Sequence, residues 1–287
     1  MSDLHAPVLD WYAENARDLP WRRPGATPWA VMVSEFMLQQ TPVARVLPVY
    51  GSWMTTWSDP AALAAAPSGE AVRAWGRLGY PRRALRLHAA ATAIVERHEG
   101  EVPARYEELI ALPGVGDCTA SAIASFAFGA SHAVLDTNVR RVLTRAVTGR
   151  EFPATSVTRA ERAQAEALVP QEQPATWAVA VMEFGALVCT ATKPACEICP
   201  IHGRCEWWER GKPPYDGPPR RGQAWAGTDR QVRGRLMSVL RDAEGSVSSA
   251  QLDAAWPEPV QRDRALASLV ADGLVVRTDD ARYTLPT

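Results

Sequence analysis

Residues 188–205 read VCTATKPACEICPIHGRC and hold four of the five cysteines in this chain of 287 residues. The cysteines follow the spacing Cys189-x6-Cys196-x2-Cys199-x5-Cys205. Four thiolates that short loops bring together form a set of soft donors for a metal ion or an iron–sulfur cluster. One short hook flanked by two longer gaps favours the consecutive ligands of a single [4Fe–4S] cluster.

Zinc and disulfides are the alternative uses of these cysteines. Structural zinc sites usually combine two Cys-x2–4-Cys hooks across a longer spacer, and this loop contains one such hook. A disulfide framework is disfavoured because the opening residues lack the basic and apolar regions of a secretory signal. We therefore expect a reducing, cytoplasmic location, associated with the nucleoid if the source is a bacterium.

The composition indicates a protein with a substantial core. Apolar residues make up 47% of the chain, and the net charge of −1 does not by itself indicate a nucleic-acid partner. No run of about 18 apolar residues is present, so we expect neither a membrane span nor a membrane partner. Apolar residues recur at spacings of three and four from residue 6 to about 186, as in Trp29, Met32, Val33 and Phe36, which predicts a mainly α fold.

Composition also suggests where the chain divides. We expect a main domain over residues 1–210 that includes the loop 189–205, a Pro/Gly-rich linker over 211–227, and a small domain over 228–287. Three helices, the second starting near a capping Ser249, and a hairpin in the small domain predict a winged-helix-like α+β unit. Residues 225–287 hold eight arginines and nine acidic residues, a net charge of −1, so packing against the main domain or a protein partner is as plausible as DNA contact.

The turn Leu112-Pro-Gly-Val-Gly116 lies between two expected helices. Gly114 and Gly116 let the backbone approach a ligand closely around Val115, and the N-terminus of the following helix attracts a phosphate. Helix, turn and helix together are typical of the hairpin that grips a DNA backbone without reading its sequence. An ordinary turn between helices is the alternative.

Two carboxylates in the chain are candidates for a functional role. Asp136 follows Gly116 by twenty residues within an apolar stretch, where it is either a helix cap or a functional group. Glu35 lies in a helical pattern whose apolar spacing places it in the core, and poor solvation would raise its pKa and suit it to act as an acid. A solvated helix face is the alternative for Glu35.

Six motifs in this order resemble the helix-hairpin-helix DNA glycosylase superfamily, and more closely the MutY-type adenine glycosylases, which remove adenine mispaired with 8-oxoguanine. The resemblance covers about residues 9–205 and implies a two-lobed helical fold with a [4Fe–4S] loop. Its motifs are Leu19-Pro-Trp-Arg22, Ser34-Glu-Phe-Met-Leu-Gln-Gln-Thr41, Trp75-Gly-Arg-Leu-Gly-Tyr80, Leu112-Pro-Gly-Val-Gly116, Leu135-Asp-Thr-Asn138 and the cysteine loop.

The resemblance also implies roles for single residues. Glu35 would protonate N7 of a flipped-out adenine, Asp136 would stay ionised and stabilise the sugar oxocarbenium ion, and Asn138 would orient the site. The implied partner is double-stranded DNA with A·8-oxoguanine or A·G mispairs, bound by a monomer. The implied DNA- and substrate-binding positions are Trp21, Arg22, Leu38, Gln39, Gln40, Thr41, Tyr80, Gly114, Val115, Gly116 and Cys118. Trp21, Leu38 and Tyr80 could instead be core residues.

The chain departs from the resembled families in informative ways. A Schiff-base lyase needs a lysine just after the turn, but Asp117 and Cys118 stand there, and the two lysines of the chain are Lys193 and Lys212. We therefore expect a monofunctional glycosylase. Val179 replaces a polar residue of many relatives, and the small domain cannot be the larger Nudix-like domain by which many relatives recognise 8-oxoguanine. A thymine or other mismatch glycosylase and a non-catalytic iron–sulfur DNA-binding protein are alternatives, and contact with a sliding clamp or repair protein is open.

Overall fold

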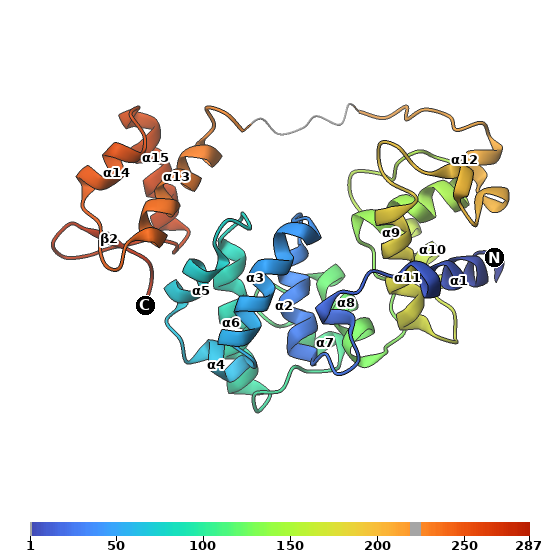
Figure 1. The fold of residues 1–287 in the computed structure, drawn as a ribbon, viewed down its shortest axis with the longest axis horizontal. Helices are drawn as coiled ribbons and strands as arrows, with labels where there is room; N and C mark the ends of the chain where they lie inside the picture. The colour runs from blue at the N-terminus through green and yellow to red at the C-terminus, as the bar shows by residue number, and fades with distance from the viewer. Residues whose placement is uncertain (1, 219–224) are drawn as a thin grey trace. The chain divides into compact units, whose positions relative to one another are not determined.

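The computed structural model describes residues 2–218 and 225–287 and is mainly helical, as predicted (Figure 1). The strands in the described residues are β1 (Val276–Arg277) and β2 (Tyr283–Thr284), which pair antiparallel with Val276 opposite Thr284. None of the helices in this part of the chain is long and apolar enough to cross a membrane.

The chain forms two compact units that interleave along the sequence. The first unit comprises Met1–Val31, Ala104–Ala111 and Val115–Pro219, and the second comprises Met32–Pro103, Leu112–Gly114 and Arg220–Thr287. The boundaries at residues 210 and 228 stay a prediction, and residues 219–224 of the expected linker lie outside the described residues.

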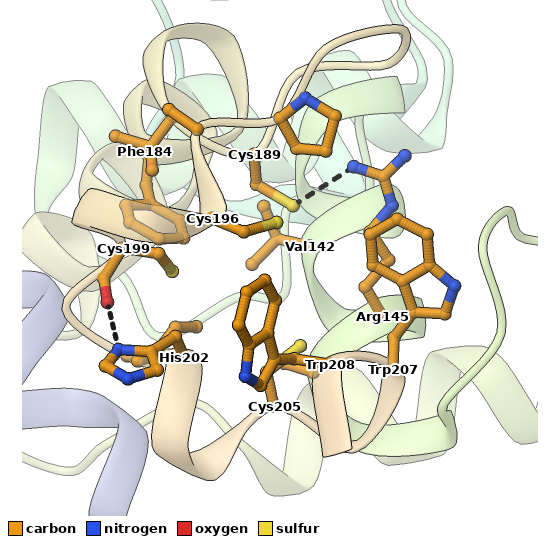
Figure 2. A pocket seen from close by; sticks show the side chains of 15 residues that line it. Val142, Arg145, Phe184, Cys189, Cys196, Cys199, His202, Cys205, Trp207 and Trp208 are labelled. Carbon is orange, nitrogen blue, oxygen red and sulfur yellow. Dashed lines mark hydrogen bonds between the residues drawn. The ribbon is translucent and has the colours of Figure 1, made fainter. Parts of the chain in front are cut away.

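The first unit is built around a long apolar helix, α11. Its helices are α1 (His5–Asn15), α7 (Tyr106–Ile110), α8 (Asp117–Phe128), α9 (Thr137–Leu143), α10 (Arg159–Ala167), α11 (Pro174–Leu187) and α12 (Glu206–Glu209). Pro174 occupies the first turn of α11, where its missing N–H costs nothing. The loop of residues 188–205 follows α11, and Cys189, Cys196, Cys199 and Cys205 surround a common space (Figure 2).

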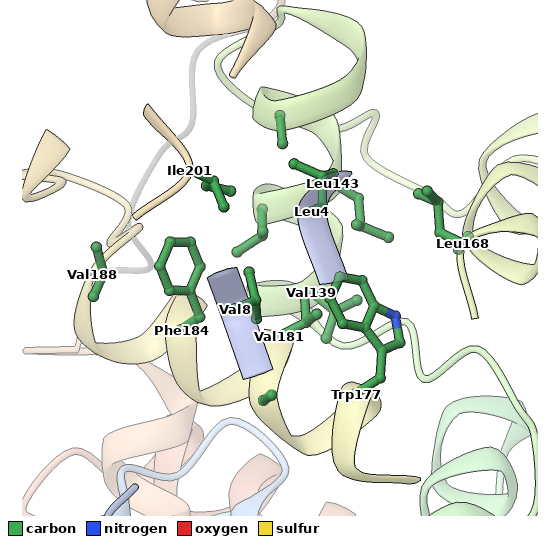
Figure 3. Close-up of a cluster of buried hydrophobic side chains, with 14 of the residues drawn as sticks. Leu4, Val8, Val139, Leu143, Leu168, Trp177, Val181, Phe184, Val188 and Ile201 are labelled. Carbon is green, nitrogen blue, oxygen red and sulfur yellow. The ribbon is translucent and has the colours of Figure 1, made fainter. Parts of the chain in front are cut away.

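The core of the first unit joins α1, α9 and α11. Figure 3 shows Val8 of α1 beside Val139 of α9 and Val181 and Phe184 of α11, and all four are buried. Ile201 of the cysteine loop belongs to the same cluster. The loop is therefore attached to the hydrophobic core by packing as well as by its cysteines.

The second unit contains a helical layer and the C-terminal helices. The helical layer consists of α2 (Pro28–Leu38, whose first turn belongs to the first unit), α3 (Val43–Thr56), α4 (Pro60–Ala64), α5 (Ser68–Trp75) and α6 (Arg82–Arg97). Helix α6 packs against α4 and α5 through buried Leu87 and Ile94, which lie on one face at helical spacing. Trp53 and Trp75 meet edge to face with ring centroids 5.6 Å apart.

The C-terminal segment, residues 225–287, folds as three helices and the hairpin. They are α13 (Asp229–Asp242), α14 (Ser249–Ala255), α15 (Pro259–Ala271), β1 and β2. A capping box starts α14, but Ser248 rather than Ser249 is the capping residue, with Gln251 as its partner. The side chain of Ser248 can reach the amide of Gln251 because its backbone is still extended.

Candidate active site and cluster loop

The predicted hairpin is present as α7, a turn and α8. Gly114 adopts φ +77°, and a Cβ there would lie 2.6 Å from the side chain of Arg86, so this position needs glycine. Gly116 is the N-cap of α8 and offers no side chain to its first amides. Val115 is buried, and Cys118 packs against a small cluster around Ala122. The turn therefore presents the backbone at the start of a twelve-residue helix.

Asp136 caps α9 and is tied to Asn138. Its Oδ1 accepts the N–H of Val139 at 2.6 Å, and its Oδ2 accepts Nδ2 of Asn138 at 3.0 Å. The Oδ1 of Asn138 in turn accepts Nη2 of Arg141 at 2.9 Å. Arg141 also donates to the carbonyl of Cys189 at 2.7 Å, so a chain of hydrogen bonds connects Asp136 to the start of the cysteine loop.

Burial has the largest effect on the pKa of Asp136. It raises the pKa of the carboxyl above its ordinary value, although the amide of Val139, the side chain of Asn138 and the charge of Arg141 act in the other direction. A cation placed beside the carboxylate would lower this pKa again. The raised pKa runs against the expectation that Asp136 is ionised. The cap is present, and the functional role of Asp136 stays a prediction.

Trp21 and Arg22 are held by a residue that the sequence analysis missed. Trp21 is buried, and Nη1 of Arg22 donates to Oε2 of Glu183 at 2.9 Å. Arg17 donates to the same carboxylate through Nε at 2.6 Å and Nη2 at 2.7 Å. Burial alone would raise the pKa of Glu183, but the bonds from Arg17 and the charge of Arg22 outweigh it and hold this pKa below its ordinary value.

A signal for Glu183 was present in the sequence. It is the single charged residue in the fourteen residues of α11, and its side chain is fully buried. A charge in an otherwise apolar helix needs a partner, because an unpaired buried charge is costly. The sequence could not indicate which of the 31 arginine and lysine side chains pairs with Glu183, since Arg17 is 166 residues away.

The remaining predicted site residues belong to the second unit. Glu35 and Leu38 are half-buried on α2, with Phe36 and Met37 fully buried beside them. Gln39, Gln40 and Thr41 follow the end of this helix, and Gln40 adopts φ +56°. Tyr80 adopts φ +49° and is exposed. Glu35 thus lies in the second unit and Asp136 in the first.

Arg83 is a second residue that the sequence analysis missed, and it forms hydrogen bonds with the segments that follow α2 and precede Tyr80. Its buried guanidinium donates to the carbonyls of Gln39 and Gly79 at 2.5 and 3.1 Å and to Oγ1 of Thr41 at 2.9 Å. It also lies 5.6 Å from the centroid of the Tyr80 ring. Burial lowers the pKa of Arg83 to about 10, although Tyr80 acts in the other direction. Left-handed backbone at non-glycine residues is strained, so Arg83 stabilises a conformation that the local sequence disfavours.

The cysteine loop is held by a buried arginine. Nη1 of Arg145 donates to Sγ of Cys189 at 3.4 Å and to the carbonyl of Thr190 at 2.7 Å, and its guanidinium lies 4.5 Å from the Trp207 ring centroid (Figure 2). Val142 and Trp208 also line this space. A positive guanidinium and apolar side chains next to the sulfurs suit a negatively charged thiolate cluster.

The donor set fits an iron–sulfur cluster, because four thiols line one space and thiolates are the ligands of such clusters. All five cysteines are free. Burial raises the pKa of Cys199 to about 12, and iron would offset this by stabilising the thiolate.

Two family models match the chain. Residues 33–166 match the HhH-GPD superfamily of base excision DNA repair proteins, and residues 189–205 match the iron–sulfur binding domain of endonuclease III. The family models and the named relatives therefore place the chain among the DNA glycosylases of base excision repair, proteins that act on DNA, with an iron–sulfur centre in the cysteine loop. The predictions of a helix-hairpin-helix fold and of a cluster are confirmed.

Individual relatives show which family of DNA glycosylases the chain is similar to. The chain is 55% identical to an adenine DNA glycosylase of Mycobacterium tuberculosis over 97% of this chain and 92% of the relative. The adenine DNA glycosylase of Mycolicibacterium smegmatis is 51% identical over 99% and 97%. A solved thermostable thymine-DNA glycosylase is 27% identical with a TM-score of 0.67, covering 72% of this chain and 96% of that one. The chain belongs to the family of adenine DNA glycosylases.

Proposed function

We propose that this chain is a monofunctional glycosylase that hydrolyses the N-glycosidic bond of adenine opposite 8-oxoguanine or guanine. The observation that carries the proposal is the half-buried carboxylate of Asp136, held by Val139 and Asn138 at the start of α9. Both carboxylate oxygens accept one of these hydrogen bonds and keep a lone pair for a further contact. A carboxylate of this kind is suited to stabilise a sugar cation after the base leaves.

The two carboxylates have different roles in the proposed reaction. Glu35 donates a proton to N7 of the flipped-out adenine, so that the base leaves as a neutral molecule. A positioned acid accelerates such a step about 100- to 10,000-fold, or roughly 3–5 kcal/mol. The oxocarbenium ion then lowers the pKa of Asp136, because an opposite charge at short range favours the ionised form. Water adds to the cation and completes hydrolysis.

Arg22 and Trp21 line the adenine pocket in this proposal, with Leu38 and Cys118. The pairing of Arg22 with Glu183 supports a fixed position for the guanidinium, because a salt bridge at 2.9 Å limits its rotamers. Gly114, Val115 and Gly116 would contact a phosphate through their backbone, and Gln39, Gln40, Thr41 and Tyr80 would contact the DNA near the opposing base.

The chemistry of the turn supports a reaction without a lyase step. The carboxylate of Asp117 accepts the hydroxyl of Tyr106 at 2.6 Å and Nη2 of Arg162 at 2.5 Å. Lys212 places its ammonium over the Trp208 ring at 4.7 Å. Asp117 and Cys118 follow the turn and carry no amine, and Lys193 and Lys212 belong to the cysteine loop and the linker, so the strand would remain intact until alkali is added.

The iron–sulfur centre has a structural part in this proposal. When bound, the cluster supplies four iron–thiolate bonds that cross-link residues 189–205. Arg145 and Arg141 connect this loop to α9, and Arg141 reaches Asn138. The cluster loop would therefore help to hold Asn138 where its side chain donates a hydrogen bond to Asp136.

Single-turnover base release on duplexes with A·8-oxoguanine, A·G, T·G or A·T tests the proposal. The products are separated with and without alkali. Adenine release opposite 8-oxoguanine with breaks only after alkali is the expected result. Release of thymine from T·G would replace the proposed substrate; the solved structural relative is named a thymine-DNA glycosylase. Breaks without alkali would overturn the monofunctional mechanism.

A further inference from the structure

Trp208 is half-buried and borders the space that the four cysteines surround. Its ring lines this space together with Cys199 and Cys205 and lies among the labelled cysteines in Figure 2. A half-buried indole presents one part of its surface to the sulfurs and another part to solvent. Trp208 is therefore placed to separate the two.

Trp207 lines the same space but has a different environment. It is buried, its Nε1 donates to the carbonyl of Pro213 at 2.9 Å, and Arg145 lies 4.5 Å from its ring centroid. Adjacent residues of a helix point in different directions, so Trp207 packs inward while Trp208 stays partly exposed. Of the two tryptophans, Trp208 is the one whose loss would open the space to water.

Two side chains from outside α12 hold the ring of Trp208. The imidazole of His202 meets it edge to face with ring centroids 5.9 Å apart, and Nζ of Lys212 lies 4.7 Å from its centroid. Both separations are within the ranges of aromatic pairing and of cation–π attraction. His202 is itself attached to the cysteine loop, because its Nδ1 is hydrogen-bonded to the carbonyl oxygen of Cys199 at 3.1 Å.

The turn that ends α12 fixes the position of Lys212. The N–H of Gly211 donates to the carbonyl of Trp208 at 2.9 Å, and the N–H of Lys212 donates to that of Trp207 at 2.8 Å. Both turn residues have left-handed backbone, with φ +73° at Gly211 and +57° at Lys212. A lysine in this conformation is strained and persists only where its surroundings determine it. The backbone therefore brings the ammonium back over the ring of Trp208.

We propose that Trp208 is a cover that keeps water and dissolved chelators from the iron–sulfur centre, and that His202 and Lys212 hold this cover in place. The residues around a metal centre control the access of solvent to it. Phe184 and Ile201, which belong to the core of the first unit, line the inner side of the space, so its outer side is where access must be limited. The proposal concerns the surroundings of the centre and does not depend on which base the protein releases.

Full-length, cluster-loaded Trp208→Ala, Trp208→Phe and Lys212→Met variants test the cover. Each protein is mixed anaerobically with increasing concentrations of EDTA, and iron loss is followed by the decay of visible absorbance and by the iron that remains after desalting. We expect Trp208→Ala to lose iron about 10-fold faster than wild type or more. Its rate should rise with EDTA concentration, because the chelator then reaches the iron directly.

Wild type should lose iron at a rate that does not depend on EDTA concentration, because release must wait for the cover to open. The phenyl ring of Trp208→Phe still covers part of the space, so this variant should stay within about twofold of wild type.

Two controls come from the cysteine loop. Ile198→Ala removes an apolar side chain that is 77% exposed and lies outside the lining of the space. Lys193→Met removes the same charge as Lys212→Met from another exposed position. We expect both controls to match wild type, and Lys212→Met to lose iron about 2- to 5-fold faster than Lys193→Met.

Two results would overturn the inference. One is that Trp208→Ala loses iron at the wild-type rate, or faster but without dependence on EDTA concentration, as a general loosening of the loop would produce. The other is that Lys212→Met and Lys193→Met lose iron at the same rate. The lysine comparison decides the question if Trp208→Ala does not keep its cluster through purification.

Discussion

Replacing Glu183 with glutamine should destabilise the protein markedly, although the two side chains have the same shape. The carboxylate is fully buried and is shared by Arg17 and Arg22. Glutamine turns one acceptor oxygen into a donor that faces a guanidinium, so one arginine loses its partner. Removing one member of a buried ion pair costs about 3–5 kcal/mol. We expect the lower end of this free-energy range, because the side chains of Arg17 and Arg22 are 34% and 16% exposed and water partly screens their charges.

A loss of about 3 kcal/mol corresponds to a fall of roughly 6–12 °C in the melting temperature of a domain of this size. Thermal or denaturant unfolding of wild type and Glu183→Gln at pH 7 measures this loss of stability. Glu107→Gln is the control, because Glu107 is exposed and pairs with Arg105 only at 3.8 Å, so its loss should change stability by less than about 0.5 kcal/mol.

The stability difference between wild type and Glu183→Gln should also depend on pH, in a direction that the pKa of Glu183 determines. The pKa of Glu183 is held below its ordinary value, so the ionised form stabilises the folded state. This contribution is complete above the unfolded-state pKa of about 4.3 and is lost as the pH falls through the lower folded-state pKa. The gap between wild type and Glu183→Gln should therefore be constant near neutrality and close in acid. Equal melting temperatures at pH 7, or a gap that widens in acid, would refute the reasoning.

Four further predictions concern the proposed site. Glu35→Gln should slow single-turnover base release about 100- to 10,000-fold while the Kd for DNA changes little, and unchanged release would exclude it as the acid. Asp136→Asn should abolish base release but keep the cap of α9, because asparagine caps helices as well as aspartate does; circular dichroism checks the fold, and retained release refutes the role. Arg83→Met should cost about 3 kcal/mol or more, measured by unfolding, because buried acceptors lose their donor. Cys199→Ser should lose iron, visible absorbance and DNA affinity together, and full affinity without iron would contradict the structural part assigned to the cluster.

The local features of this fold were predictable from the sequence. The cysteine spacing indicated a cluster, the Pro-Gly-Val-Gly turn indicated the hairpin, and the three helices and strand pair expected after residue 228 are present as α13, α14, α15, β1 and β2. Ser249 was expected to cap α14 and Ser248 does so, because either serine suits the pattern and only the backbone conformation decides between them. Glu35 and Asp136 were candidates from their sequence surroundings, the resemblance supplied the other proposed site residues, and all their roles stay predictions.

By itself, the sequence determined what depends on short separations along the chain: helical periodicity, the glycine turn and the ligand set of residues 189–205. Only the tertiary structure decided which buried charges meet. Glu183 pairs with arginines more than 160 residues away, and Arg83 joins the end of α2 to Tyr80. Periodicity reports whether a residue is buried, but a buried charge can be satisfied by any donor that packing brings near it. The choice of partner is therefore a property of the folded chain, and so is the place of Arg230 beside Tyr80.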